Sequence, residues 1–341
     1  KPGMALVVIT HMDSAHKSLL SELLSKYTQM DVSQAVDGVA VTPNTVYIIP
    51  PNKDLSIVGG ILHTQEPVAY RGFRQPIDLF FRSLAEDQME NAICIILSGT
   101  GSDGTLGLKA VKGAGGIAIV QEESSAKYDG MPRSAIATGM VDFVLPVEKI
   151  PERLIAFVNR SGSIRRAVGD GETSSPGDDV LQDILHLVRQ RTGHNFFHYK
   201  KNTIIRRIEK RILVNNVDSP EAYYELLKEK VNEASLLLKD LLIGVTSFFR
   251  DPDAFTMVRE KVIPDIFKDK RPDEPVRIWS AGCSTGEEAY SLAILIADYL
   301  RHTRRSFTVQ IFATDVDKEA IERALAGLYP QNIAADLPPE F

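Results

Sequence analysis

The sequence has few cysteines and no long apolar stretch. Its 341 residues include a single tryptophan and two cysteines, Cys94 and Cys283. Two cysteines cannot build a disulfide framework, so we expect a reducing compartment and a cytoplasmic location. The longest purely apolar runs, such as Ala92–Leu97, are far too short to span a bilayer, which argues against membrane insertion. The first residues also lack the pattern of a signal peptide.

A large excess of one charge is also missing. The formal net charge is −6, which gives no support to nucleic-acid binding. The hydrophobic fraction of 44% and the charged fraction of 25% are typical of globular domains, and the length predicts two or three of them. The chain starts almost directly on an expected strand and stops without a finishing element, so we expect it to be cut at both ends.

One segment departs from this composition and divides the chain. Residues 161–179 are rich in Gly, Ser and Asp, which is typical of a flexible linker. The preceding part alternates strand and helix signals, which favours a mostly parallel α/β sheet. Its expected elements are strands Ala5–Ile9, Val46–Ile49, Ala92–Leu97, Ile117–Val120 and Phe143–Leu145, a hairpin within Ser56–Thr64, and helices Pro76–Ala85 and Gly104–Lys112.

The part after the linker begins with helices. Amphipathic spacing predicts them over Val180–Arg191 and residues 199–212, 219–231 and 233–243. The pattern then changes to strand, glycine loop, helix and strand, which is the order of a nucleotide-binding fold. These elements are expected at Val276–Ser280, Gly282–Gly286, Glu287–Leu300 and Thr308–Ala313.

Two polar residues of the first part follow expected strands. His11 comes just after Ala5–Ile9, and Asp103 lies in the glycine loop after Ala92–Leu97. Functional sites of open α/β sheets lie beyond the carboxyl ends of the strands. An Asp–His pair there has the geometry of a hydrolase site if a nucleophile is near, although a simple turn and a packing histidine are the competing interpretation.

Several stretches together resemble the catalytic domain of the chemotaxis protein-glutamate methylesterases, the CheB family. The matching residues are Val7–Met12, Val46–Pro51, Pro76–Asp78 with Phe81, Ser98–Gly104 and Tyr128–Arg133. The resemblance implies that His11 is the general base and that Asp103 completes a Ser-His-Asp triad. The Gly-Ala-Ser-x-Gly-Gly loop that carries the family's serine is absent from this chain, and Thr100 stands where the family often has Met.

The charges around the second glycine loop, Gly282–Gly286, indicate the class of ligand that it favours. It lacks the G-x-G-x-x-G spacing of dinucleotide sites and the Gly-Lys-Ser/Thr of a P-loop. Glu287 at the start of the following helix opposes phosphate and favours a cationic group, as in S-adenosylmethionine. Asp315 follows the next strand, where a carboxylate can accept from both ribose hydroxyls. Asp315 and Asp317 alone make a poor metal site, so no metal is expected.

Residues 180–341 resemble the chemotaxis receptor methyltransferases, the CheR family. The matching stretches are Tyr199–Lys200, Ile205–Ile208, Val245–Asp251, Ile278–Ser291, Ala313–Asp317 and Gly327–Tyr329. The resemblance implies that Ala281 and Glu287 contact the amino-acid end of S-adenosylmethionine and that Asp315 holds its ribose. It also places Thr246 and Arg250 over the cofactor, facing the reactive centre. Gly244 stands where the family often has Asn.

The helix expected over residues 199–212 is strongly basic. Lys200, Arg207 and Arg211 fall on one side of it at helical spacing. A solvated face is the plain interpretation, and nucleic-acid binding is disfavoured because few aromatic residues are interleaved. The resemblance implies that this face docks on the acidic, glutamate-bearing helices of chemotaxis receptors.

We therefore predict a hybrid chemotaxis adaptation protein. Its α/β fold comprises a parallel-sheet methylesterase domain, a small all-α domain and a partial Rossmann-like methyltransferase domain. The expected bounds are 1–160 for the methylesterase-like domain, 161–179 for the linker, 180–265 for the helical domain and 266–341 for the cofactor-binding part. The alternative is a signalling scaffold that docks on acidic helical partners without catalysis.

Overall fold

The computed structural model describes residues 2–11, 20–67, 74–158, 177–330, 333, 334, 336–338, 340 and 341. By its contacts the chain divides into two compact units, with the boundary between Ile243 and Gly244. Most of the predicted linker, residues 161–179, lies outside the described residues. Among the residues that are described, no helix combines the length and the hydrophobicity needed to cross a bilayer.

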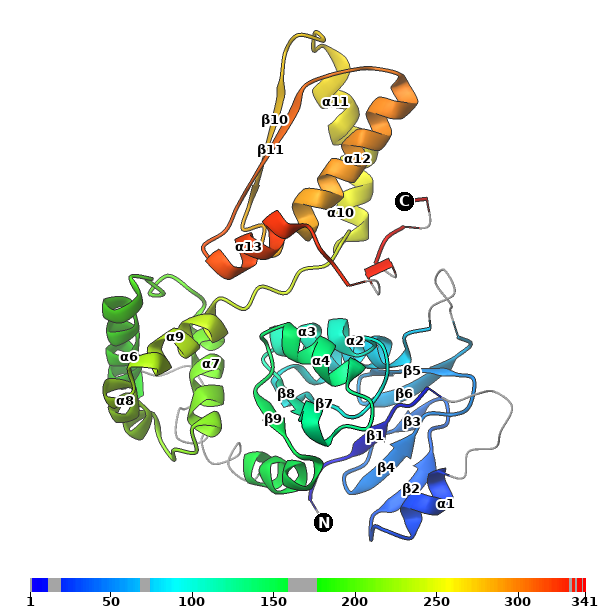
Figure 1. Cartoon of the computed structure of the whole chain (residues 1–341), viewed down its shortest axis with the longest axis vertical. Helices are drawn as coiled ribbons and strands as arrows, with labels where there is room; N and C mark the ends of the chain where they lie inside the picture. The colour runs from blue at the N-terminus through cyan, green and yellow to red at the C-terminus, as the bar shows by residue number, and fades with distance from the viewer. Residues whose placement is uncertain are drawn as a thin grey trace. The chain divides into compact units, whose positions relative to one another are not determined.

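The first unit contains two parallel three-stranded sheets (Figure 1). In one, β4 (Thr45–Ile48) lies between β1 (Leu6–Val8) and β2 (Asp31–Gln34), and Val46 is opposite Leu6. In the other, β8 lies between β7 and β9, and Ile117 is opposite Ile93. The bounds of this second sheet are β7 Ile93–Ile96, β8 Ile117–Gln121 and β9 Phe143–Leu145. The predicted parallel α/β architecture is therefore confirmed.

A third sheet of the first unit is antiparallel, in the order β3-β6-β5. Its strands are β3 (Val39–Ala40), β5 (Asp54–Val58) and β6 (Ile61–Gln65). Gly59 and Gly60 connect β5 to β6 with φ values of 59° and 74°, so the predicted hairpin is confirmed. The strands β2 and β3 were not predicted, because they are short and lack an apolar alternation.

Helices complete this α/β domain. They are α1 (Leu20–Ser25), α2 (Pro76–Gln88), α3 (Thr105–Gly113), α4 (Gly130–Ala137) and a helix over residues 150–158, with short 3₁₀ turns at Met89–Asn91, Glu123–Ser125 and Val147–Lys149. The apolar side of α2 presents Ile77, Phe80 and Phe81 to the core. Leu108 of α3 and Ile96 of β7 belong to the same buried cluster, which fixes α2 and α3 beside the sheet.

The first unit also contains a helical domain (Figure 1). It consists of α6 (Gly177–Thr192), α7 (Lys201–Val214), α8 (Pro220–Glu229) and α9 (Val231–Leu241). One buried cluster joins them, with Ile184, Ile208, Tyr223 and Leu237 as members from the four helices. The start of α8 has the expected helix signals, because Ser219 Oγ accepts from the Ala222 amide at 3.2 Å and Pro220 follows it.

The second unit is built on a parallel pair of strands, β10 (Val276–Ala281) and β11 (Val309–Thr314). Its helices are α10 (Pro252–Met257), a π-helical turn (Val258–Val262), α11 (Ile263–Lys268), α12 (Glu287–Thr303) and α13 (Lys318–Ala326). Residues 244–265, which the sequence placed with the helical domain, pack in this unit, because Phe249 and Ile263 join its core.

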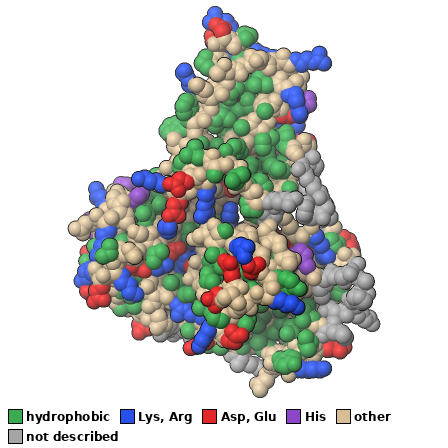
Figure 2. Space-filling view, in the orientation of Figure 1, with side chains coloured by type: hydrophobic (Ala, Val, Ile, Leu, Met, Phe, Trp, Pro, Cys, Tyr) green, Lys and Arg blue, Asp and Glu red, His purple; other side chains and the backbone are tan. Residues whose placement is uncertain are grey.

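One face of this strand pair carries exposed aromatic side chains. Trp279 and Phe312 lie opposite each other in the register and are 71% and 52% exposed. Trp279 Nε1 donates to Thr314 Oγ1 at 3.0 Å, which holds the indole against the end of β11. Hydrophobic side chains are visible over much of this unit in Figure 2.

Candidate functional site: two glycine corners

The first candidate site lies at the first glycine corner, which we define as residues 97–104 between β7 and α3. His11 Nε2 is 2.8 Å from Asp103 Oδ2, although 92 residues separate them in the sequence. The predicted Asp–His pair is thus formed. His11 is 48% exposed while Asp103 is 7% exposed, so the imidazole can reach a substrate and the carboxylate cannot.

The carboxylate of Asp103 is fixed from behind by the start of α2. It accepts from the amides of Ile77 at 3.0 Å and Asp78 at 2.9 Å, and also from that of Gly104 at 2.9 Å. The first amides of a helix have no partner within the helix, and the helix dipole favours a negative charge there. These amides therefore fix the orientation of the Asp103 carboxylate beside His11.

The glycine corner itself needs an unusual backbone. Gly104 has a φ of 88° and precedes α3, and a Cβ at this position would lie 2.8 Å from Ile77 Cγ2. Gly99 is hydrogen-bonded on both sides, donating to Tyr128 O and accepting from the Met131 amide, each at 2.9 Å. The Tyr128–Arg133 stretch and the glycine corner therefore form one rigid edge beside the Asp–His pair.

The second candidate site lies at the second glycine corner, residues 282–286 between β10 and α12. Asp315 follows β11, and its Oδ2 accepts from the Ser284 amide at 2.7 Å. Its Oδ1 accepts from the Asp317 amide at 2.9 Å. Asp315 thus joins the two strand ends, and Ser284 has a φ of 48°, which turns its amide toward that carboxylate.

Glu287 lies at the other end of this corner. It is the first residue of α12, is buried, and accepts from Thr285 Oγ1 at 2.6 Å. Tyr329 donates from its hydroxyl to Thr285 O at 2.7 Å and so holds the same loop. Burial, followed by the nearby Asp315 carboxylate, raises the pKa of the Cys283 thiol, so this cysteine stays a neutral packing residue.

The segment with Thr246 and Arg250 is tied to the same corner. Ser284 Oγ donates to Gly244 O at 3.3 Å, and Phe249 donates from its amide to Ser291 Oγ at 3.1 Å. Thr246 is half-buried, whereas Arg250 is exposed and donates to Val245 O. Ala281 is the exposed last residue of β10, so the structure gathers the predicted cofactor residues around one strand edge.

The charges of this corner fit S-adenosylmethionine. Two acids of this corner, Glu287 and Asp315, give it a negative charge that suits the ammonium and sulfonium of that cofactor and opposes a phosphate. Asp315 Oδ1 and Oδ2 each accept one backbone hydrogen bond, and a carboxylate oxygen can accept more than one, so capacity remains for ribose hydroxyls. The two corners define an oriented Asp–His pair in the first unit and a cation-accepting cofactor loop in the second.

Comparison with known families agrees with these two classes of site. The family model for CheB methylesterase matches residues 1–154. The models for the all-alpha domain and the SAM-binding domain of CheR methyltransferase match residues 179–242 and 244–341. The chain is therefore a fused arrangement of a CheB-type methylesterase domain and the two CheR-type domains, and S-adenosylmethionine is the indicated cofactor. These domains support a role in chemotaxis adaptation.

Individual proteins are similar to all or part of this chain. An uncharacterized 104.1 kDa protein in the hypE 3′ region of Rhodobacter capsulatus is 40% identical, over 94% of this chain and 36% of its own length. The protein-glutamate methylesterase/protein-glutamine glutaminase of Photorhabdus laumondii is 33% identical over 47% of each chain. The crystal structure of the Thermotoga maritima CheB methylesterase catalytic domain is 32% identical, with a TM-score of 0.42 over 46% of this chain and 85% of that one. The chain thus spans about a third to a half of the length of the Rhodobacter capsulatus and Photorhabdus laumondii proteins.

The predicted docking residues occupy different environments. Lys200 precedes α7 and is exposed. Arg207 and Arg211 are buried, at 5% and 8% exposure, and Arg211 forms a two-pronged pair with Glu233 at 2.8 and 2.7 Å. The sequence placed these three cations on one open face, but in the structure only Lys200 is open to solvent.

Two supporting residues were not singled out from the sequence. Asp78 is 2% exposed and accepts from the Gly107 amide at 2.7 Å, which locks α2 to α3 behind Asp103. Tyr329 holds Thr285, as described above. Both belong to the stretches that resemble the families, but only their contacts reveal what they support.

Proposed function

We propose that this protein takes part in both directions of receptor adaptation. It methylates glutamate side chains of methyl-accepting chemotaxis receptors and hydrolyses the resulting methyl esters, in the cytoplasm. The observation that carries the first activity is the placement of Asp315 and Glu287 at one glycine corner, tied by Ser284 and Thr285. The Asp–His pair of the first unit supports the second activity.

The methylation step requires little acid–base catalysis from the protein. Bound S-adenosylmethionine supplies an electrophilic methyl group on a sulfonium. A receptor glutamate is already ionised at neutral pH, so its carboxylate can attack without a strong base. The residues of this chain then act by positioning: Ala281, Glu287 and Asp315 hold the cofactor, and Thr246 and Arg250 cover it. Arg250 orients the incoming carboxylate through a forked hydrogen bond.

The hydrolysis step uses His11 as general base. Asp103 occupies one ring nitrogen, which leaves the other to accept the proton of a nucleophile. No Gly-x-Ser-x-Gly-Gly loop is present in this sequence. The nucleophile of this proposed triad is therefore not identified in this sequence, and hydrolysis is assayed in the full-length protein.

The cofactor proposal is tested by calorimetric titration with S-adenosylhomocysteine. The chain is expected to bind it, and Asp315→Ala is expected to abolish binding because the ribose loses its acceptor and Ser284 its anchor. Asp273→Ala is the matched control, since this aspartate of the same unit is 73% exposed and forms an ion pair with Arg271, which is also exposed. Absence of binding by the unmodified chain would contradict the proposal and favour a scaffold.

Hydrolysis is tested on a peptide that carries a glutamate methyl ester. Release of methanol by the full-length protein is expected, and His11→Ala is expected to remove it while S-adenosylhomocysteine binding is unchanged. Equal release by the variant and the parent protein would exclude the Asp–His pair as the hydrolytic site.

A further inference from the structure

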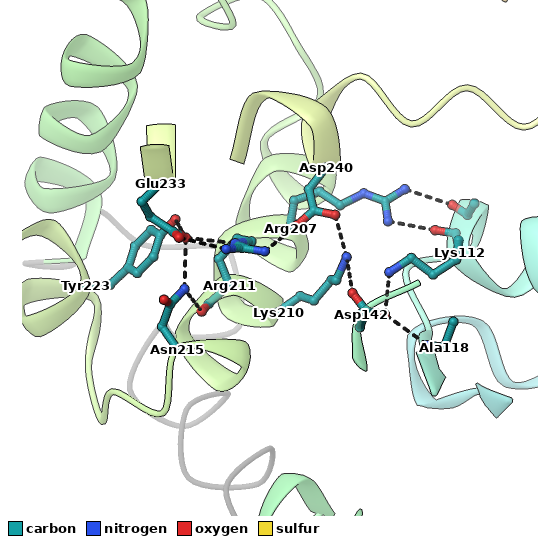
Figure 3. A network of polar contacts seen from close by, with 11 residues as sticks. Lys112, Ala118, Asp142, Arg207, Lys210, Arg211, Asn215, Tyr223, Glu233 and Asp240 are labelled. Atoms are coloured by element: carbon teal, nitrogen blue, oxygen red, sulfur yellow. Dashed lines mark hydrogen bonds and ion pairs between the residues drawn. The ribbon is translucent and has the colours of Figure 1, made fainter. Parts of the chain in front are cut away.

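The basic helix α7 has a second cationic side that contacts the α/β domain. Arg207, Lys210 and Val214 follow one another at spacings of three and four residues, so they lie along one side of the helix. The side formed by Ile204, Ile208 and Ile212 packs in the core of the helical domain. Figure 3 shows Arg207 and Lys210 directed toward residues of the α/β domain.

Arg207 binds the end of α3. Its Nη1 donates to Lys112 O at 2.8 Å and its Nη2 donates to Gly113 O at 3.1 Å. The last carbonyls of a helix lack partners within the helix and form the negative end of its dipole. The α3 carbonyls therefore occupy guanidinium donors that an anionic partner of Arg207 would otherwise use.

Lys210 binds the α/β domain through a buried carboxylate. Its Nζ is 2.7 Å from Asp142 Oδ1, and it also pairs with Asp240 of α9. Asp142 Oδ2 in turn accepts from Lys112 Nζ at 2.6 Å and from the Ala118 amide at 2.9 Å. Burial acts to raise the pKa of Asp142, but the two ammonium groups outweigh it and lower that pKa, so Asp142 stays ionised.

Contacts at the rim extend this interface. Arg206 of α7 lies 3.6 Å from Glu90, and Arg153 donates to Val214 O at 2.6 Å. Phe157 packs against buried clusters of both domains. Three successive cations of α7 are thus matched by acceptors of the α/β domain, namely the Glu90 and Asp142 carboxylates and the α3 carbonyls.

We propose that the α/β domain masks the cationic side of α7 formed by Arg206, Arg207 and Lys210, and that an acidic helical partner competes with it for these groups. The proposal rests on the proposed function, in which glutamate-bearing helices are the partner of α7. Arg207 donates to two α3 carbonyls, Lys210 pairs with Asp142, and both side chains are buried, so an outside anion has no access to them until this contact opens. The contact would therefore make partner docking depend on the state of the methylesterase-like domain.

The closed contact is measured first, on the whole chain, with an amine-acetylating reagent and mass spectrometry. Lys210 is 4% exposed and is expected to react at least about tenfold more slowly than the exposed Lys200 and Lys201. In Asp142→Asn the Lys210 ammonium loses its ionic partner in the α/β domain, and its reactivity is expected to rise toward that of Lys200. A Lys210 that reacts as fast as Lys200 in the parent chain would overturn the proposal.

Competition is measured with a synthetic helical peptide that carries glutamates at spacings of three and four residues, by fluorescence anisotropy. Asp142→Asn is expected to bind it about tenfold more tightly than the parent chain, because the cations of α7 become available. Asp37→Asn is the matched control, since this aspartate is 64% exposed and pairs with His63, and it is expected to leave the affinity unchanged.

A second variant guards against misfolding of Asp142→Asn. Arg153→Ala removes the rim hydrogen bond to Val214 O and leaves Asp142 with both of its ammonium partners, and it is expected to raise both Lys210 reactivity and peptide affinity. Variants that expose Lys210 without a gain in peptide affinity would overturn the masking proposal. Titration with S-adenosylhomocysteine measures cofactor binding by the second unit separately. A result that contradicts the proposed function is thereby distinguished from one that contradicts only the masking of α7.

Discussion

The two glycine corners are built alike but place their acids differently. Each runs from a parallel strand through glycines to a helix, and each ends in a left-handed glycine, Gly104 with a φ of 88° and Gly286 with a φ of 97°. In the first corner the acid, Asp103, precedes that glycine and turns back under the start of α2. In the second the acid, Glu287, follows the glycine and begins the helix.

This difference separates an orienting carboxylate from a binding one. Asp103 receives three backbone amides and one imidazole, so its lone pairs are committed to the protein. Asp315 accepts from two backbone amides and Glu287 from the Thr285 hydroxyl, so each is held by fewer groups than Asp103, which suits the ligand role that we propose for them. The same local backbone thus supports either chemistry, depending on which side of the glycine the acid stands.

The largest effect is expected for Asp103→Asn. An amide cannot stabilise the imidazolium that forms on His11, so methyl ester hydrolysis by the full-length protein should fall by roughly 10³–10⁴-fold. Methanol release measures the loss, and S-adenosylhomocysteine affinity should not change. A loss below tenfold would mean that Asp103 supports the fold of the first corner without orienting a base.

Alanine at the two left-handed glycines should destabilise both corners. Gly104→Ala is expected to cost about 2–4 kcal/mol, from the left-handed backbone and from the contact with the buried Ile77. Gly286→Ala should cost at least as much, because its backbone is also left-handed and its Cβ would meet Ala324 Cβ at 2.9 Å, the Tyr329 hydroxyl at 3.0 Å and Ala324 Cα at 3.3 Å. Denaturant unfolding measures both costs.

Gly59→Ala is the control for the backbone cost alone. Gly59 has a φ of 59° and no atom within 4 Å of its Cβ position. Gly59→Ala should therefore lower the free energy of unfolding by about 1–2 kcal/mol. An equal loss for Gly59→Ala and Gly104→Ala would show that packing against Ile77 contributes nothing.

The helix that follows the first corner, α3, has a buried lysine in its last turn, and the pH dependence of stability should reveal its effect. Burial lowers the pKa of Lys112, in the last turn of α3, to about 8 against an ordinary value of 10.5. Between these two values the unfolded chain binds more protons than the folded one, so the contribution of Lys112 to the free energy of unfolding rises with pH, by up to about 3 kcal/mol.

Lys112→Met should remove that contribution. The free energy of unfolding of the parent chain, relative to that of the variant, is expected to rise between pH 8 and pH 10. Denaturant unfolding across this range measures it, with Lys26→Met, an exposed lysine, as the control. A difference that is flat with pH would show that Lys112 keeps its proton throughout.

The smallest effect is expected for Tyr329→Phe. Loss of the hydroxyl leaves Thr285 O without that donor, which should cost about 1 kcal/mol and lower S-adenosylhomocysteine affinity a few-fold. Tyr299→Phe is the control, since this tyrosine is in the same core without a contact to the second corner. Unchanged affinity in Tyr329→Phe would mean that Asp315 positions the loop for binding without a contribution from Tyr329.

The sequence predicted the corners better than the surfaces around them. His11 and Asp103 could be paired because the ends of parallel strands share one edge of a sheet, and Asp315 was found by the same rule. The burial of Arg207 could not be predicted, because helical spacing shows which residues share a side but not what packs against it. Its partners, Lys112 O and Gly113 O, are backbone atoms more than ninety residues away, which no local pattern indicates.

The exposed indole of Trp279 has a practical consequence. It is the single tryptophan of this sequence, so the tryptophan fluorescence of these 341 residues arises from the second unit alone. Its ring nitrogen is bonded to Thr314, the neighbour of Asp315 in sequence, and the ring is open to solvent. The emission of this one residue is therefore an intrinsic optical signal for events at the cofactor edge, and the first unit remains spectroscopically silent at the same wavelengths.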